Sequence, residues 1–289
     1  MNKCVCIILN YNDAAETIRL LDKICSFACF TGIVVVDNHS SDNSYSVLKQ
    51  YESKKIKVIQ TDKNGGYGYG NNCGIRYAAE NMDADYFLIC NPDVLFDETL
   101  VYRLIKVMTD NPVCGAVSAV QTDINGNEVI QSAWKIPDKK RYIASIGKIG
   151  WHFMSGYYYG LDCLHQNKEV KVDCIAGSLL LLSREAFEKT GGYDENIFLY
   201  CEETVLGCKL KKAGLHTYIC SDITYQHLHG ITIKKSFRSE YRRKKLLCDS
   251  HHYTLRHWLN GSAIELAADR VMIWIALAEE AILGVIRKN

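Results

Sequence analysis

Two acidic segments of the chain carry side chains suited to chemistry. Asp93 ends the tripeptide Asn91-Pro92-Asp93 directly after an apolar run, and such a rigid turn would present a ligand for Mg²⁺ or Mn²⁺. Glu202 and Glu203 are neighbours at the start of an expected helix, so their side chains diverge and only one can face a given site. One of them could act as a general base. Helix capping and turn formation are the structural alternatives.

A histidine pair and a basic cluster add further candidates. His227 and His229 follow an expected strand, and residues two apart on an extended segment point to opposite sides, so one of them could bind a ligand. Lysines and arginines gather between residues 234 and 245. They could neutralise a diphosphate or an anionic lipid surface, or form a solvated helix face.

The stretch from Asn64 to Asn72 holds four glycines before an expected helix over Gly74–Glu80. Backbone amides in such a loop can approach a ligand closely, and a helix N-terminus attracts anions. The stretch lacks the Gly-Lys-Ser/Thr of a Walker loop, and the first expected strand ends without the glycines of a dinucleotide-binding fingerprint. A tight turn is the alternative. We take Asn64, Gly65, Gly70 and Asn71 as candidate nucleotide contacts, together with Asn91 and Asp93.

The elements that position these residues can be predicted from the sequence pattern. Short apolar runs alternate with amphipathic ones, which predicts an α/β fold with a mostly parallel central sheet and helices on both faces. Strands are expected over residues 4–9, 33–36, 56–60, 86–89 and 113–120, and helices over 14–27, 44–52 and 97–108. Ligands of parallel sheets bind at the carboxyl ends of the strands. Those ends carry Asn10, Tyr11, Asp37, Asn38 and Asn64, which favours a polar ligand rich in hydrogen bonds.

The second half of the chain is less regular. Residues 134–162 are rich in Gly, Tyr and basic side chains, which predicts a long functional loop. Trp134 in this segment and Tyr200 beside the acidic pair are our candidate acceptor contacts. Further strands are expected over 170–182 and 216–220, and helices over 184–189, 202–213, 237–259 and 262–287.

Composition limits the function classes. The 289 residues carry 34 Lys+Arg and 33 Asp+Glu, a net charge of +1, so no broad basic field for nucleic acid exists. A hydrophobic fraction of 48% excludes a disordered chain. No run reaches the ~18 uncharged apolar residues of a membrane helix. Thirteen cysteines without a Cys-x-x-Cys pair, and an opening unlike a secretory signal, indicate a reducing cytoplasm.

With these pieces in order, the sequence resembles the family 2 glycosyltransferases, in particular their bacterial rhamnosyltransferase-like branch. The similarity runs from about residue 5 to residue 257. It is carried by segments 7–12 (IILNYN), 34–42 (VVVDNHSSD), 64–75 (NGGYGYGNNCGI), 88–93 (LICNPD), 191–203 (GGYDENIFLYCEE), 227–230 (HLHG) and 253–256 (YTLR).

The resemblance implies a GT-A fold and inverting transfer of a sugar from a nucleoside diphosphate donor. It implies that Asp37 binds the nucleobase, that Asp93 and His227 hold Mn²⁺ or Mg²⁺, and that Glu203 is the base. Glu202 would then hold an acceptor hydroxyl or a loop. Three positions depart from the family pattern: Asn91 replaces an Asp, Glu203 replaces an Asp, and Val205 replaces a further Asp.

The resemblance also implies the organisation and partners of the chain. Residues 1–235 would form the transferase domain, with a nucleotide-binding half (1–120) and an acceptor-binding half (121–235), and residues 236–289 a helical extension. The donor would be dTDP-rhamnose or a UDP-sugar. The acceptor would be a saccharide or a lipid-linked saccharide of a cell-surface polysaccharide, and nucleic acid is not expected as a partner. The extension could pair with a second subunit or touch the inner face of the cytoplasmic membrane.

Two other classes fit parts of the pattern. A sugar nucleotidylyltransferase would need a glycine-rich basic loop after the first strand, and residues 10–13 (NYND) do not provide one. A non-catalytic nucleotide-sugar-binding protein stays open, because Asn91 and Val205 could mark lost chemistry. Hydrolysis of donor with Mn²⁺ would separate the enzyme from the binder.

Overall fold

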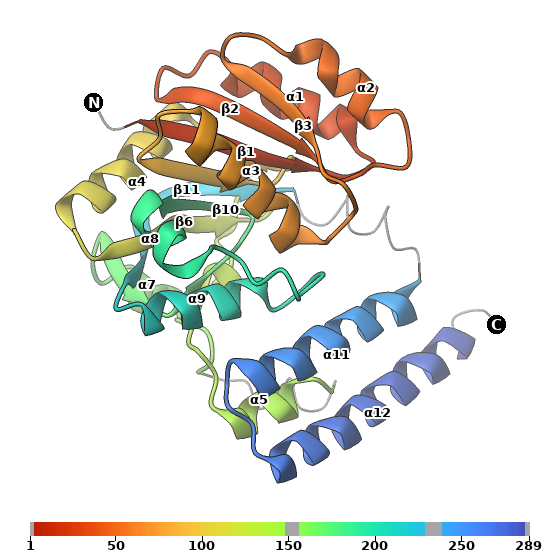
Figure 1. The fold of residues 1–289 in the computed structure, drawn as a ribbon. Helices are drawn as coiled ribbons and strands as arrows, with labels where there is room; N and C mark the ends of the chain where they lie inside the picture. The colour runs from red at the N-terminus through yellow and green to blue at the C-terminus, as the bar shows by residue number, and fades with distance from the viewer. Residues whose placement is uncertain (1–2, 148–155, 229–238, 287–289) are drawn as a thin grey trace.

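The N-terminal half is a four-stranded parallel sheet in the order β3-β2-β1-β4 (Figure 1). The computed structural model describes residues 3–147, 156–228 and 239–286. The strands are β1 (Cys4–Asn10), β2 (Phe30–Asp37), β3 (Ile56–Gln60) and β4 (Tyr86–Cys90). They alternate with the helices α1 (Ala14–Ile24), α2 (Ser44–Leu48), which continues as a 3₁₀ turn over Lys49–Tyr51, and α3 (Tyr67–Asn81). Right-handed crossovers of this type bring the carboxyl ends of all four strands to one edge.

Antiparallel strands enter in the second half and extend the same sheet. β10 (Leu179–Ser183) pairs antiparallel with both β4 and β6 (Cys114–Thr122). β11 (His216–His227) runs parallel to β6 and antiparallel to β5 (Val94–Leu95) and β8 (Glu169–Val172). β7 (Ala133–Trp134) and β9 (Cys174–Ile175) form a separate small sheet. The remaining elements of this half are α4 (Glu98–Asp110), a 3₁₀ turn over Ile130–Ser132, α5 (Lys139–Ser145), α7 (Leu161–Leu164), α8 (Arg184–Thr190) and α9 (Glu202–Lys212).

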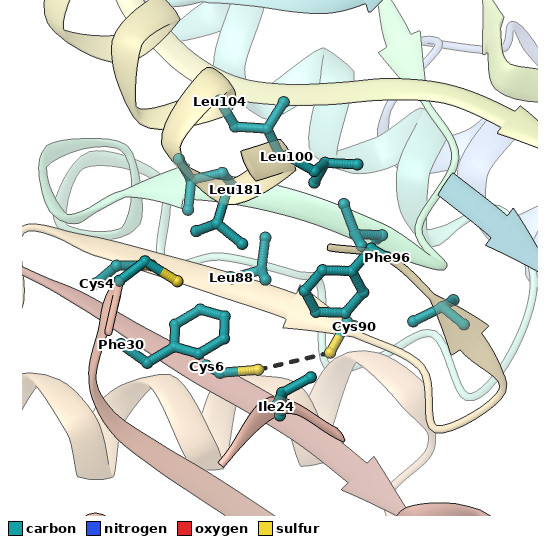
Figure 2. Close-up of a cluster of buried hydrophobic side chains, with 14 of the residues drawn as sticks. Cys4, Cys6, Ile24, Phe30, Leu88, Cys90, Phe96, Leu100, Leu104 and Leu181 are labelled. Atoms are coloured by element: carbon teal, nitrogen blue, oxygen red, sulfur yellow. Dashed lines mark hydrogen bonds between the residues drawn. The ribbon is translucent and has the colours of Figure 1, made fainter. Parts of the chain in front are cut away.

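Alternating strand residues bury the two faces of the sheet. In β1, Cys4 and Cys6 face the layer that α1, α2 and α4 complete, whereas Val5 and Ile7 face the layer of α3, α8 and α9. Figure 2 shows the first layer, where the Sγ atoms of Cys6 and Cys90 lie 3.6 Å apart. Burial raises the pKa of the Cys6 thiol well above its usual value. These thiols therefore act as small apolar side chains.

A helical hairpin follows the sheet domain and lies to one side of it (Figure 1). It consists of α11 (Glu240–His257) and α12 (Ala263–Ile286), and both helices pack against α5. Lys139 of α5 forms an ion pair with Glu265 of α12 at 2.9 Å. Within the described ranges, every helix is too short or too polar to cross a membrane.

Several elements differ from their expected bounds. α3 begins at Tyr67, not at Gly74, because Gly68 and Gly70 let this helix pack closely: a Cβ at Gly70 would lie 2.3 Å from Leu9 Cδ1. The expected irregular segment 134–162 contains α5 and part of α7. The expected boundary at residue 120 falls inside β6, and the boundary at 235 lies outside the described residues.

Candidate active site

Asp37 is the last residue of β2 and pairs with Asn10, the last residue of β1. This carboxylate is fully buried, and each of its oxygens accepts two hydrogen bonds. Oδ1 accepts from Asn10 Nδ2 at 2.8 Å and from Ser40 Oγ at 2.5 Å. Oδ2 accepts from the Ser40 amide and from Gln60 Nε2, both at 3.0 Å. Asp37 therefore orders the loop after β2, and a nucleobase N–H could bind it only by replacing one of these four hydrogen bonds.

Asn38 joins this strand end to the glycine-rich segment. Its Nδ2 donates to Asn64 Oδ1 at 3.1 Å and to the Gly66 carbonyl at 3.0 Å. Gly66 has a φ of +94°, and a Cβ there would lie 2.1 Å from the Phe198 carbonyl oxygen. Glycine is required at this position because the loop reaches the chain just before the acidic pair.

Four other expected nucleotide contacts fall into a half-buried and a buried group. Tyr11 and Gly65 are half-buried at the sheet edge. Gly70 and Asn71 are buried inside α3, where Asn71 Nδ2 donates to the Tyr67 carbonyl at 3.1 Å. These two residues therefore pack within the fold. Their roles toward a nucleotide stay predictions.

Asp93, which follows β4, and His227, the last residue of β11, lie in contact. Asp93 is 4% exposed, and its Oδ1 lies 3.2 Å from His227 Nε2. β5 and the end of β11 bring the two together, since His227 pairs with Val94 in the antiparallel register. His229, the alternative ligand, lies outside the described residues. In the part of the chain that the structure describes, no three His, Cys, Asp or Glu side chains converge as metal ligands.

A cavity of about 650 Å³ opens beside this pair. Asn91 and His227 line one side of it, and Glu202 and Glu203 line another. The expected acceptor contacts Trp134 and Tyr200 also line it. The structure thus brings His227 of the candidate metal pair into one cavity with the candidate base and acceptor residues, whereas Asp93 is not among the residues that line it.

The two carboxylates differ in their surroundings. Glu202 is 3% exposed, and among the described residues its Oε1 has no hydrogen-bond partner. Burial, and then the charge of Glu203, raises the pKa of Glu202 to about 8. Burial also raises the pKa of Glu203, which is half-buried and lies over Gly177. Glu203 is therefore the more accessible of the two to a substrate.

The turn before α9 has an uncommon backbone. Tyr200 and Cys201 have φ angles of +73° and +68°, a left-handed conformation that side chains rarely adopt. Each such residue costs roughly 1–3 kcal/mol, and residues of this kind cluster at functional sites. Here they direct the chain from the Phe198 contact into the helix that carries both carboxylates.

Aromatic side chains line much of the cavity, and most were not identified from the sequence. Trp134 donates from Nε1 to Thr204 Oγ1 at 3.1 Å and packs edge-to-face with Tyr158. Tyr67 donates to the Gly177 carbonyl at 2.7 Å. Tyr142, Tyr157 and His251 complete this wall. The Gly- and Tyr-rich composition of residues 134–162 was the one available signal for them.

Of the basic cluster, Lys244 of α11 lines the cavity, and residues 234 and 235 lie outside the described ranges.

A sequence profile described as Glycosyl transferase family 2 matches residues 5–190, more than half of the chain. The chain belongs to this family. The matched range includes β1 to β10 and the Asn91-Pro92-Asp93 turn, and it ends before the Glu202–Glu203 pair. The expected family resemblance is therefore confirmed.

Two curated relatives carry rhamnosyltransferase names. The N-acetylglucosaminyl-diphospho-decaprenol L-rhamnosyltransferase of Mycobacterium tuberculosis is 28% identical over 212 residues, which are 68% of this chain and 66% of that protein. Rhamnosyltransferase WbbL of Escherichia coli is 27% identical over 187 residues, 61% of this chain and 67% of that protein. The chain thus spans about two thirds of the length of these relatives.

Solved structures confirm the fold. The mannosyltransferase PcManGT from Pyrobaculum calidifontis, in complex with GDP-Man and Mn²⁺, superposes with a TM-score of 0.59 at 17% identity. The match covers 96% of this chain and 73% of that structure. The expected GT-A-type α/β fold is thereby confirmed, with antiparallel strands added in the second half.

Proposed function

We propose that this family 2 member transfers a sugar, with inversion, from a nucleoside diphosphate donor to a saccharide or lipid-linked saccharide of a cell-surface polysaccharide. The observation that supports this most is the single cavity shared by Asn91, His227, Glu202 and Glu203. Rhamnose from dTDP-rhamnose is the first candidate, because both relatives described above carry rhamnosyltransferase names. A UDP-sugar is the second.

Glu203 is our proposed base. The acceptor hydroxyl must lose its proton as the new bond to the anomeric carbon forms, and a positioned carboxylate can accept that proton. Glu203 lines the cavity and is less buried than Glu202. Glu202, with an Oε1 that lacks a partner in the described chain, is placed to hold an acceptor hydroxyl. The rest of the cavity wall orients the two substrates.

Asp93 and His227 are our proposed ligands for Mn²⁺ or Mg²⁺. A carboxylate oxygen and an imidazole nitrogen 3.2 Å apart can share one ion, and this mixed donor set suits Mn²⁺. Two protein ligands leave positions for donor phosphate oxygens. A bound divalent ion would neutralise charge on the diphosphate leaving group.

A donor screen tests the proposal. Thermal shift with dTDP-rhamnose, UDP-glucose and UDP-galactofuranose, each with and without Mn²⁺, should show one donor that stabilises the fold through preferential binding. Donor hydrolysis with Mn²⁺ should then be measurable for that donor. Selective binding without any hydrolysis or transfer would instead indicate a non-catalytic nucleotide-sugar-binding protein.

We further propose that the hairpin attaches the enzyme to the inner face of the cytoplasmic membrane. α12 leaves large apolar side chains exposed on its outer face, among them Ile264 at 83% and Trp274 at 72%. α11 of the same hairpin supplies Lys244, Leu247 and His251 to the cavity. A lipid-linked acceptor keeps its lipid in the bilayer, so an apolar face on the hairpin that also helps to line the cavity suits it.

Liposome co-sedimentation tests this attachment. The protein should sediment with phospholipid vesicles, and Trp274→Ser combined with Ile264→Ser should release it while the fold is kept. Pairing of α12 with a second copy is the competing outcome. It would appear as a dimer in light scattering that the same substitutions dissociate, with no vesicle binding before or after.

A further inference from the structure

The turn that carries the two carboxylates is held from outside α9. Ser250 Oγ of α11 donates to the Leu199 carbonyl at 2.7 Å, and the Tyr142 hydroxyl of α5 donates to Cys201 Sγ at 3.3 Å. These contacts bracket Tyr200 and Cys201, whose φ angles are positive. An unfavourable backbone of this kind persists only where its surroundings hold it.

Tyr142 is held in turn by His251 of α11. Their rings stack in nearly parallel planes, with centroids 3.8 Å apart and 2° between the planes. His251 Nε2 also lies 2.8 Å from the Tyr142 carbonyl oxygen. Because a carbonyl oxygen can only accept, His251 carries a proton on Nε2 and donates it. The imidazole therefore fixes both the ring and the backbone of Tyr142.

Asp269 of α12 lies behind His251. Its carboxylate is fully buried, with Oδ1 3.1 Å from His251 Nδ1 and Oδ2 2.7 Å from His252 Nδ1. The His252 contact is a hydrogen bond, and the His251 contact is an ion pair. Burial acts to raise the pKa of Asp269, but the two histidines outweigh it and hold this pKa below its usual value. A buried carboxylate of this kind depends on its paired groups, and they on it.

We propose that Asp269 is a positioning residue for the catalytic carboxylates. Through His251 and Tyr142 it holds the Tyr200–Cys201 turn, and this turn presents Glu203 to the cavity. The inference rests on the proposed function, in which Glu203 is the base. It makes the rate of sugar transfer depend on the last helix of the chain, 24 residues that lie beyond the matched family profile.

Two conservative substitutions test the chain of contacts. Asp269→Asn keeps the shape of the side chain and removes its charge, and Tyr142→Phe keeps the stacked ring and removes the O–H donor. Each should lower kcat about tenfold, since small displacements of a catalytic group are costly. KM for donor and for acceptor should change less than twofold. The matched control is Asp249→Asn, the same chemical change at an exposed aspartate of α11, and it should keep the wild-type kcat.

A double-mutant cycle with Glu203→Gln separates positioning from general destabilisation. If Asp269 acts through Glu203, then Asp269→Asn in the Glu203→Gln background should slow transfer less than twofold further, because groups that act as a unit are not additive. A full tenfold loss in that background would overturn the inference alone. So would an unchanged kcat in both single variants, or an equal loss in Asp249→Asn. Wild-type turnover of Glu203→Gln would overturn the proposed role of Glu203 as base, and the inference with it.

Discussion

Two groups of polar side chains differ in how many of their atoms have hydrogen-bond partners. One group lies at the ends of β1 and β2, and the other lies at the start of α9. Both oxygens of Asp37 accept two hydrogen bonds from neighbouring residues, and the surrounding loop has its amides and hydroxyls paired in the same way. Glu202, by contrast, is buried with a carboxylate oxygen that has no partner in the described chain, and its pKa is raised to about 8.

Under the proposed function, this contrast separates nucleotide recognition from proton transfer. A site that only recognises a ligand gains from groups that are already fixed by their neighbours. A site that moves a proton needs a carboxylate with a pKa shifted toward neutral pH, and this requires burial and incomplete pairing. Tyr200 and Cys201, which have positive φ angles, directly precede the two carboxylates and belong to the same group. Each prediction below alters one of the two sides.

The largest effect is expected from Glu203→Gln. Loss of the base should lower turnover by ~10²–10⁴ while donor affinity hardly changes. Steady-state transfer assays with a donor titration measure both quantities. The matched control is Glu202→Gln, which should mainly weaken acceptor binding. If Glu202→Gln abolished turnover and Glu203→Gln kept it, the two roles would be exchanged.

On the recognition side, Asp37→Ala should weaken binding of UDP or dTDP. Loss of a charged hydrogen bond costs about 1.5–3 kcal/mol, which is roughly 10- to 150-fold in affinity. Asp37 also orders the loop after β2, so Ser40→Ala is the control that removes one of these internal bonds and keeps the carboxylate. Calorimetric titration of both variants with UDP and with dTDP measures these affinities. Unchanged affinity of Asp37→Ala for both nucleotides would refute the assignment.

Much of the recognition side could be predicted from the sequence because its signals are local. Asn10, Asp37 and Asn38 each follow a short apolar run, and parallel strands place such ends at one edge. The start of the helix after the glycine-rich segment was predicted wrongly, for a physical reason. Glycine disfavours helix by about 1 kcal/mol, but close packing against Leu9 and Asn38 outweighs this penalty at Gly70, so α3 starts seven residues earlier than expected.

The wall of the cavity could not be predicted in the same way. Tyr142, His251 and Asp269 occupy ordinary positions in amphipathic helices, and nothing in their neighbours along the chain marks them. They meet only because α5, α11 and α12 pack together. Glu202 and Glu203 were recognised as a pair, but their difference in burial follows from the packing of α9 and not from the sequence.

A smaller effect is expected from Gly177→Ala. A Cβ at this position would lie 2.7 Å from Glu203 Oε1, so the carboxylate would have to move by a few tenths of an ångström. Turnover should fall on the order of tenfold, below the ~10²-fold that a misplacement of 1 Å can cost. Gly160→Ala, where φ is −62° and a Cβ meets open space, controls for the general effect of replacing glycine. An unchanged turnover of Gly177→Ala would show that the position of Glu203 is not critical.

The smallest effect concerns stability and its pH dependence. Because burial raises the pKa of Glu202 to about 8, from an ordinary value near 4.5, the folded protein binds a proton that the unfolded chain releases. This contribution to stability is fully present below pH 4.5 and is lost as the pH rises through 8. Glu202→Gln carries no such proton, so its melting temperature should exceed that of the wild type at pH 8.5 and approach it at pH 5. A shift of ~2–4 °C is expected for each kcal/mol. Thermal melts of both proteins across this range measure it, with Glu185→Gln on the exposed side of α8 as the control that should show no such trend. If the gap between Glu202→Gln and wild type were constant with pH, Glu202 would be ionised at neutral pH, and the contrast with Asp37 would disappear.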